Sequence, residues 1–278
     1  DSARARGLDP LSLRAAALDS DAGANLLDVL PLPSSFSYSQ FDLYDRCPSQ
    51  YAFRHVYRIP SSRTGAAFSF GIAAHSVFER FTKERRERMA RGEPPPTRED
   101  LGKLFEAEWP AGQFGDQTTE QTYSRRVGTL LDNFWQGELE GIGQAEHEEL
   151  DFRLTIEPAD GAPPFAINGQ IDRVDRLLDG GVEIVDYKTG RIESQKGVDE
   201  SLQLSIYALA ARDELGLGTP ERVTLYFTEQ ATRMSTTRTD ERLDAARDAW
   251  AERGARTRAG AFPGGPPPAQ RHPRPIAA

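Results

Sequence analysis

The sequence has little cysteine, no long apolar runs and no net positive charge, and the first two shortages each exclude a class of protein. Cys47 is the only cysteine in 278 residues, which excludes an internal disulfide and any multi-cysteine metal site built by this chain alone. No stretch approaches the roughly 18 consecutive apolar residues that a membrane span needs. The N-terminus also lacks a basic segment followed by an apolar run. We therefore expect a cytoplasmic chain with no membrane partner.

Acidic residues outnumber basic ones, 43 against 34, so the formal net charge is −9 at pH 7. Binding to nucleic acid needs local positive potential, because the partner is a row of phosphates. The overall charge does not exclude such a partner, since a nuclease concentrates carboxylates at its metal site and needs only a basic stripe nearby.

One basic stretch, residues 83–91, holds Lys83, Arg85, Arg86, Arg88 and Arg91. Glu84 and Glu87 interrupt it, four residues before Arg88 and Arg91. That spacing favours a solvated helix face whose charges pair with one another, rather than a face that binds phosphate.

The apolar pattern divides the chain into three parts. Residues 1–33 are rich in Ala, Asp, Leu and Pro without a sustained period, which predicts a linker-like or disordered segment. Residues 262–278 carry six prolines and no periodicity, so we expect a disordered tail that buries no core face. The predicted folded domain spans residues 34–261.

The first half of that domain is expected to be helical. Ser37 and Gln40 have the spacing of a capping box and predict a short helix that ends before Cys47. Apolar residues at helical spacing predict further helices over 69–91, from Thr97 onward, and over 118–140.

The second half reads as a sheet with interspersed helices. Alternating apolar residues predict strands, and longer periodic stretches predict helices. The expected strands are 150–156, 165–178, 182–187, 222–228 and 233–239, and the expected helices are 198–215 and 240–258. This order predicts an α/β fold in which one central mixed β-sheet is flanked by helices, with a helical N-terminal part.

Three polar residues are expected to converge on the central hairpin. With a three-residue loop over 179–181, Asp172 lies opposite Lys188. Asp186 and Lys188 share a face, because side chains alternate along a strand. A two-residue turn would change the parity and separate the three residues.

Two carboxylates beside a single lysine repel one another unless a cation compensates. Oxygen ligands of this kind suit Mg²⁺ or Mn²⁺, which neutralise charge on a phosphate that is being cleaved. The alternative is a set of solvated strand residues near a sheet edge, where charge guards against aggregation.

The flanking residues favour the metal site, because they resemble a known family. The matching stretches are 37–41, 46–48 with Tyr51, Phe70-Gly71 with His75 and Glu79, 169–175, 185–190 and 203–207. Together they resemble the PD-(D/E)XK nuclease superfamily, and within it the RecB-like nuclease domains associated with helicases. The resemblance covers roughly residues 36–262 and implies a restriction-endonuclease-like core.

The resemblance also implies roles for individual residues. His75, Asp172 and Asp186 would ligate the metal, together with the main-chain carbonyl of Tyr187. Lys188 would position the nucleophilic water or stabilise charge on the phosphate. Two further residues, Gln203 and Tyr207, would support the site.

Taken alone, these additional positions have ordinary explanations. Gln203 and Tyr207 lie one helical turn apart and could form an amphipathic helix edge. A single histidine such as His75 among apolar neighbours is usually a packing residue. Glu79 fits an i,i+4 partner of Lys83 better than a group behind the metal ligands.

The sequence departs from the resembling family at its C-terminal end. Many helicase-associated members hold an iron–sulfur cluster with one early cysteine and three near the C-terminus. Cys47 occupies the early position, but no cysteine follows Ala261-Phe262-Pro263. Since a cluster needs its thiolates together, we expect no iron–sulfur cluster here.

The leading hypothesis is therefore an Mg²⁺- or Mn²⁺-dependent deoxyribonuclease that hydrolyses phosphodiester bonds in single- or double-stranded DNA. The resemblance places it in DNA repair or recombination, as part of or partner to a helicase. The alternative is a catalytically silent DNA-binding or subunit-bridging module. A metal-dependent hydrolase acting on another substrate is a third possibility.

Overall fold

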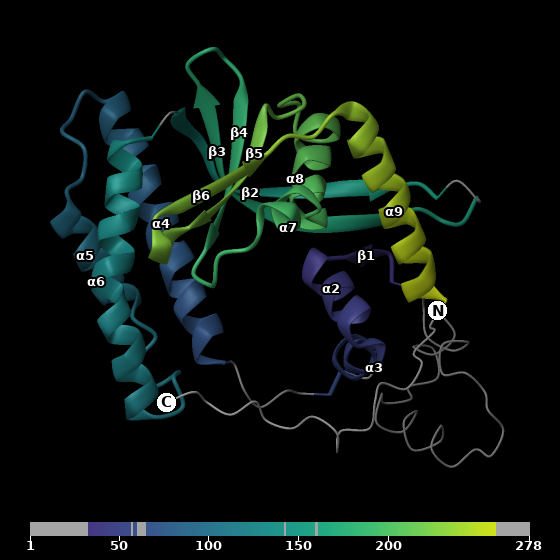
Figure 1. Cartoon of the computed structure of the whole chain (residues 1–278), viewed down its shortest axis with the longest axis horizontal. Coiled ribbons are helices and arrows are strands. Elements are labelled where there is room, and N and C mark those ends of the chain that lie inside the picture. Colours follow the sequence, from purple (N-terminus) through teal and green to yellow (C-terminus); the bar gives the residue numbers. More distant parts are fainter. Residues whose placement is uncertain (1–32, 57, 60–64, 142, 159–160, 260–278) are drawn as a thin grey trace, which may run out of the picture.

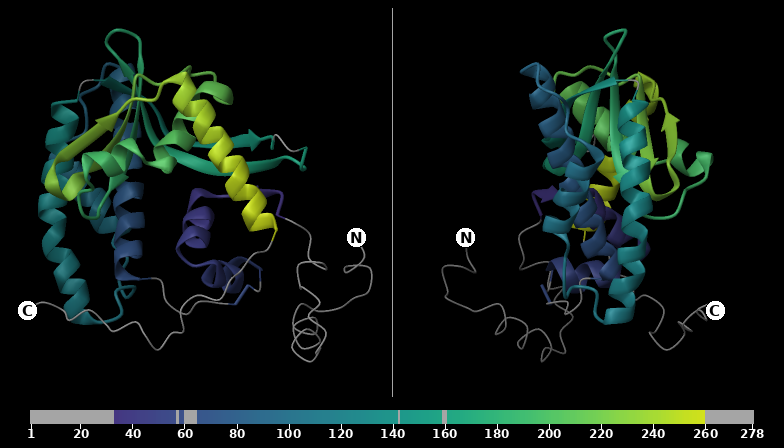
Figure 2. Two further views of the ribbon diagram at one scale, coloured as in Figure 1. Left: turned by 45° about the vertical axis from the view of Figure 1, so that its right-hand side comes forward. Right: turned by 90° about the vertical axis from the view of Figure 1, so that its left-hand side faces the viewer.

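The computed structural model of the chain describes residues 33–56, 58–59, 65–141, 143–158 and 161–259. The predicted tail 262–278 lies outside the described residues, as does all of the predicted linker 1–33 except residue 33. Helices cover both faces of one mixed sheet, which confirms the predicted α/β, restriction-endonuclease-like architecture (Figures 1 and 2). Among the described residues, no helix is long and apolar enough to cross a membrane.

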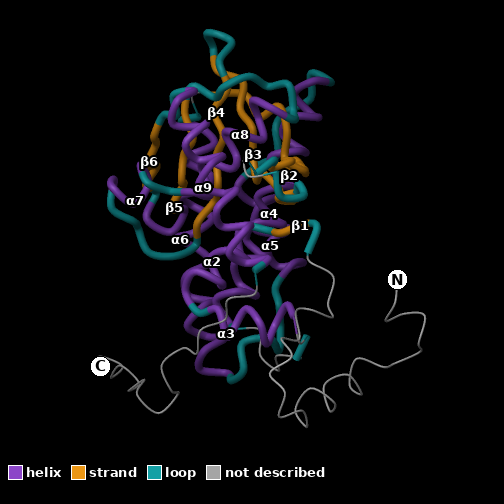
Figure 3. The backbone as a smooth tube through the Cα atoms, turned by 90° about the vertical axis from the view of Figure 1, so that its right-hand side faces the viewer, coloured by secondary structure: helices purple, strands orange, loops and turns teal. Residues whose placement is uncertain are grey.

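The N-terminal elements are short; β1 lies at the sheet, and α3 lies away from it (Figure 3). They are β1 (Ser35–Phe36), α2 (Tyr38–Arg46), α3 (Pro48–Tyr51) and a π-helical turn, η3 (Ala52–Val56). The Ser37 side chain accepts from the backbone of Gln40, and the Gln40 side chain accepts from the backbone of Ser37. The predicted capping box is therefore confirmed, and it fixes where α2 begins.

Three longer helices follow, close to the predicted ranges. They are α4 (Ala66–Ala90), α5 (Arg98–Glu108) and α6 (Gln117–Leu139). Helix α4 packs on β2 and β3 and also contacts α5 and α6. Their apolar residues form one of two cores, together with Val185, Tyr187 and Tyr226 from the sheet.

The sheet contains, besides β1, the strands β2 (Gly143–Ile156), β3 (Phe165–Leu177), β4 (Val182–Lys188), β5 (Arg222–Phe227) and β6 (Thr232–Thr236). Strand β3 is central: β2 pairs with it antiparallel along its length, while β1 and β4 share its other side. Strand β4 then pairs in parallel with β5, which pairs antiparallel with β6.

The other face of the sheet is covered by α8 (Leu202–Asp213) and α9 (Asp240–Arg258), with α2 beside them. Alternate residues of β4, such as Val182 and Ile184, point into this second core. The predicted helix 198–215 is in fact two, since α7 (Gln195–Asp199) ends before Ser201 caps α8. A short 3-10 turn, η4 (Thr228–Gln230), joins β5 to β6.

The predicted register of the central hairpin is wrong by two residues. Arg173 pairs with Val185 and Arg176 with Val182, so the pairing extrapolates Asp172 to Asp186 and not to Lys188. The turn falls one residue earlier than predicted, because Gly180 takes a left-handed φ of 91° and its N–H donates to the carbonyl of Leu177. A two-residue shift keeps every β4 side chain on its predicted face.

The ladder between β2 and β3 is interrupted at two points, of which one is a register shift between Ala145 and His147. The other lies beside a cavity that Glu149 and Asp172 line. Glu148 pairs with Arg173 and Leu150 with Ile171, which leaves Glu149 opposite Asp172 with neither residue in a regular pair. Glu149 has a φ of 46°, a left-handed conformation that is costly for a residue other than glycine. Figure 1 shows β2 and β3 changing direction along their length.

The basic stretch on α4 is paired, but only partly as predicted. Arg88 pairs with Glu84 at i,i+4. The expected Glu87–Arg91 pair is wrong, since Arg91 contacts Glu93 instead. The two remaining arginines reach other elements: Arg85 pairs with Glu138 and Arg86 with Glu148.

Candidate active site

The predicted site residues of β4 lie at the carboxyl end of that strand. Asp186 is 2% exposed, and its Oδ2 lies 2.6 Å from Nζ of Lys188. The Lys188 carbonyl accepts a hydrogen bond from Thr228 Oγ1 at 3.2 Å, which ties the strand end to η4. A buried carboxylate therefore has a lysine beside it that remains partly open to solvent.

Helix α8 presents Gln203 and Tyr207 to this pair, as their spacing predicts. The Tyr207 hydroxyl donates to Asp186 Oδ1 at 3.0 Å, and Gln203 Nε2 lies 3.3 Å from the same oxygen. Gln203 Oε1 accepts from Lys188 Nζ at 3.1 Å. One glutamine thus touches both members of the ion pair and fixes their relative position.

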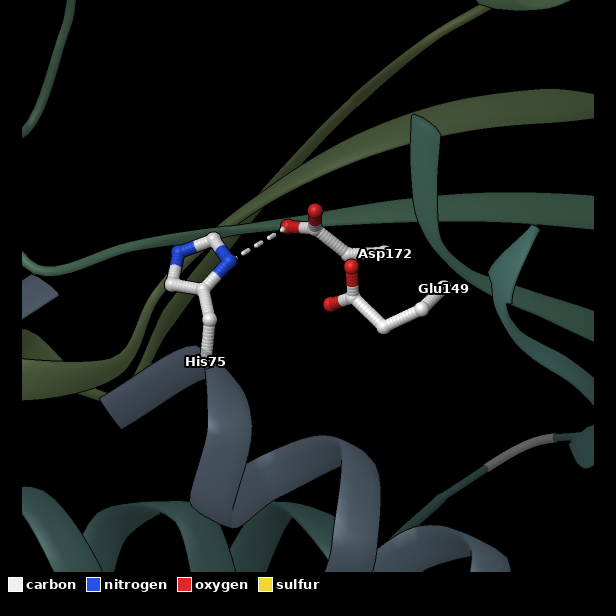
Figure 4. A group of neighbouring side chains, drawn as sticks. All are labelled: His75, Glu149 and Asp172. Carbon is white, nitrogen blue, oxygen red and sulfur yellow. Dashed lines mark ion pairs between the residues drawn. The ribbon is translucent and has the colours of Figure 1, made fainter. Parts of the chain in front are cut away.

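Asp172 and His75 form the other half of the site. Asp172 Oδ2 accepts the backbone N–H of Tyr187 at 2.8 Å and lies 3.3 Å from Nδ1 of His75 (Figure 4). The hydrogen bond from the Tyr187 backbone to the Asp172 side chain joins β3 to β4 beyond their last regular pair, Arg173 with Val185. Asp172 is thereby held beside the main chain that joins Asp186 to Lys188.

Sequence reasoning missed Glu149, which completes this half. Ligand atoms of His75, Glu149 and Asp172 all lie within 4.8 Å of one another, in an arrangement able to hold a metal ion. Figure 4 shows the three side chains converging from α4, β2 and β3. Glu149 has no motif around it, and only its place opposite Asp172 at the interrupted ladder reveals it.

Burial and repulsion by Asp172 raise the pKa values of the Asp186 and Glu149 carboxyl groups. Burial is the main cause of a raised pKa at Asp186; Lys188 lowers that pKa and Asp172 raises it further. Burial, then the charge of Asp172, raises the pKa of Glu149 to about 7. Negative charge therefore accumulates here at a cost, which a bound cation would relieve.

The two basic groups of the site keep their protons. Burial lowers the pKa of His75, but the charge and hydrogen bond of Asp172, with smaller contributions from other carboxylates, raise it overall to about 9. Burial likewise lowers the pKa of Lys188, while Asp186 more than reverses the effect and leaves it raised. A proton on His75 occupies the place of a cation, so metal and proton compete for that nitrogen.

A cavity of about 560 Å³ opens onto His75, Glu149 and Asp172. Glu79 lines the same cavity, and its charge helps to raise the pKa of Glu149. No ion pair joins the described side chains of Glu79 and Lys83, so the predicted i,i+4 pair of these two residues is wrong.

The donor set fits a divalent cation. Carboxylate oxygens of Asp172 and Glu149 and a nitrogen of His75 lie within 4.8 Å of one another. Asp186 lies outside this group, but near enough for the charge of Asp172 to raise the pKa of Asp186. Apart from its ion pair with Lys188, Asp186 Oδ2 has no hydrogen-bond partner among the described residues, although it is buried. Hard oxygen donors with one imidazole suit Mg²⁺ or Mn²⁺.

Buried carboxylates and a lysine thus lie at one strand end of a mixed sheet. Residues 35–269 match the family model of the PD-(D/E)XK nuclease superfamily, and the chain belongs to that superfamily. The match confirms the superfamily to which the sequence motifs pointed.

Comparison with individual proteins adds little detail. No curated protein matches the chain at a significant level. Fourteen solved chains do match. One of them, the crystal structure of SSO0001, is 16% identical over 80% of this chain and 87% of its own, with a TM-score of 0.29. That likeness is too distant to support any statement about the site.

Proposed function

We propose that this chain is a metal-dependent DNA nuclease that hydrolyses phosphodiester bonds at the site formed by Asp172, Asp186 and Lys188. The observation that carries the proposal is the buried Asp186 carboxylate, 2.6 Å from the Lys188 ammonium. It lies next to a second group of metal-ligating side chains at the mouth of a cavity.

Each residue has a role that its contacts support. His75, Asp172 and Asp186, with the main-chain carbonyl of Tyr187, hold Mg²⁺ or Mn²⁺, and Glu149 adds a further carboxylate. The cation supplies stabilisation of negative charge on the scissile phosphate and lowers the pKa of a nearby water. Lys188 keeps its proton and places positive charge where the attacked phosphate becomes more negative.

Gln203 and Tyr207 act as positioning residues. Tyr207 donates to Asp186 Oδ1, which leaves Oδ2 of the same carboxylate directed at Lys188. Burial, and then the charge of Asp186, keep the pKa of Tyr207 well above its usual range, so its hydroxyl remains a donor. Gln203 holds the lysine side chain against the carboxylate.

The motifs shared with RecB-like domains support a finer proposal: the nuclease works in DNA repair or recombination with a helicase domain or subunit. The test is to co-purify the chain with candidate helicases of its source. DNA unwinding coupled to cleavage in the resulting complex would support the partnership, and a chain that binds none of them would refute it.

Incubation of the purified chain with labelled single- and double-stranded DNA and Mg²⁺ or Mn²⁺ tests the nuclease activity. We expect cleavage that EDTA stops and that Asp186→Ala removes. Binding of DNA without cleavage at any metal concentration would instead identify a catalytically silent module. Neither binding nor cleavage would indicate a hydrolase that acts on another substrate.

A further inference from the structure

Two large apolar side chains stand exposed on α4 at the wall of the active-site cavity. Phe68 is 60% exposed and Ile72 is 55% exposed. They lie one helical turn apart, and both line the cavity that contains His75, Glu149 and Asp172.

The core does not account for this pair. The buried apolar residues of α4 lie on the other side of the helix; they are Phe70, Ala73, Ala74, Val77, Phe78 and Phe81. A large apolar side chain that stays exposed forgoes the stabilisation that its burial would give. An apolar surface kept open beside a metal site indicates that a ligand covers it.

The cavity lining is divided by chemistry. Its charged end carries Glu79, Glu149, Asp172 and His75, whereas Ala67, Phe68, Gly71 and Ile72 form an apolar wall. A nucleotide is divided in the same way, into a charged phosphate and a flat, uncharged base. A cavity of about 560 Å³ has the size typical of a small-ligand site, so it has room for a nucleotide.

The spacing along α4 suits this assignment. Ile72 lies about 4.5 Å and Phe68 about 10 Å before His75 along the helix axis, at 1.5 Å per residue. When a phosphate lies at the metal ligands, the base of the same nucleotide or of the next nucleotide reaches the wall that contains Phe68 and Ile72.

We propose that Phe68 and Ile72 form a base-binding subsite, in which Phe68 stacks on an unpaired nucleobase beside the scissile phosphate. This inference rests on the nuclease activity proposed above and adds a substrate-positioning role for α4. Stacking of bases on aromatic side chains is tolerant of sequence, because every base has a π-face. The subsite therefore selects for unpaired nucleotides and not for a particular base.

The test compares steady-state cleavage of a labelled oligothymidylate with that of an abasic oligomer of equal length, in the presence of Mn²⁺. We expect Phe68→Ala to raise KM for oligothymidylate on the order of 10-fold, the effect of losing one stacked base. The kcat should change little, since the contact is away from the reacting atoms. The KM for the abasic oligomer should not change.

Three further variants make the test specific. Phe68→Trp should retain the low KM, and Phe68→Leu should not. Met89→Ala is the matched control, because Met89 is a 46% exposed apolar residue at the far end of the same helix that does not line this cavity. We expect it to behave like the unaltered chain.

The inference is overturned if Phe68→Ala leaves both KM values unchanged, or raises both equally. It is also overturned if the substitution changes the oligomeric state and not DNA binding, since a second copy would then cover the patch. Absence of cleavage by the unaltered chain would refute the nuclease proposal itself, so the two failures are distinguishable.

Discussion

Replacing Glu149 with glutamine should stabilise the metal-free chain and weaken its binding of Mn²⁺. The substitution keeps the shape of the side chain and removes one of the carboxylates that meet at the cavity. In the folded chain burial, and then the charge of Asp172, raise the pKa of Glu149 from 4.5 to about 7. The folded state therefore disfavours the ionised form.

The upward shift of the Glu149 pKa determines how the stability of the metal-free chain changes with pH. A carboxyl group with a raised pKa costs no stability below about pH 4.5, and its cost grows until the pH passes about 7. The full shift corresponds to at most about 3–4 kcal/mol at 1.36 kcal/mol per pH unit. Solvent in the open cavity screens the charge, so we expect a gain of about 1 kcal/mol at pH 8. For a domain of this size that gain raises Tm by about 3 °C.

Metal binding should change in the opposite sense. Loss of the Glu149 carboxylate should weaken Mn²⁺ binding on the order of 10-fold or more, as for other groups that hold a metal or its ligands. Thermal melts from pH 5 to pH 8 in EDTA, beside calorimetric Mn²⁺ titrations, measure both effects. Glu157→Gln is the matched control, since Glu157 is an exposed glutamate directly after the same strand and does not line the cavity.

Equal Mn²⁺ affinities for Glu149→Gln and the unaltered chain would show that Glu149 is not a metal ligand. The quantity to compare is the Tm of the variant minus the Tm of the unaltered chain. If this difference is lower at pH 8 than at pH 5, the electrostatic reasoning is refuted.

Further substitutions separate the roles of the remaining residues. Asp186→Ala should abolish cleavage without lowering Tm in EDTA, because its burial is unfavourable when metal is absent; retained cleavage would sink the assignment. Lys188→Ala should slow single-turnover cleavage about 10²-fold and tighten Mn²⁺ binding, while Lys196→Ala, which removes an exposed lysine, should do neither. Tyr207→Phe removes a hydrogen bond to a charged group, worth about 1.5–3 kcal/mol, and should slow cleavage roughly 10-fold or more; an unchanged rate would refute its positioning role. Cys47→Ser should be as active as the unaltered chain, which we expect to be colourless; stoichiometric iron would contradict this.

Local patterns in the sequence were sufficient to predict most elements and to place the residues of one half of the site on common faces, while the roles of those residues rested on the family resemblance. Asp186 and Lys188 are two residues apart on one strand, and Gln203 and Tyr207 one turn apart on one helix. Such spacings fix which side chains share a face without knowledge of the partner strand. The capping box at Ser37 is local in the same sense.

The other half depends on contacts between distant segments, which local patterns do not contain. Glu149 is brought to Asp172 by strand pairing and by a left-handed backbone conformation at a non-glycine residue. The hairpin register was missed by two residues because the turn falls one residue earlier than the predicted loop 179–181, with Gly180 in the left-handed conformation. Strand β1, with two residues, is too short to leave any alternation in the sequence.

The central claim is that one divalent cation, held by His75, Asp172 and Asp186, drives DNA cleavage. Its most direct test compares the Mn²⁺ concentration that half-saturates the chain in calorimetry with the concentration that gives half-maximal single-turnover cleavage. We expect the two midpoints to coincide, and we expect both binding and cleavage to be lost together in Asp186→Ala. Cleavage that persists in EDTA, or midpoints that differ on the order of 10-fold, would contradict the account.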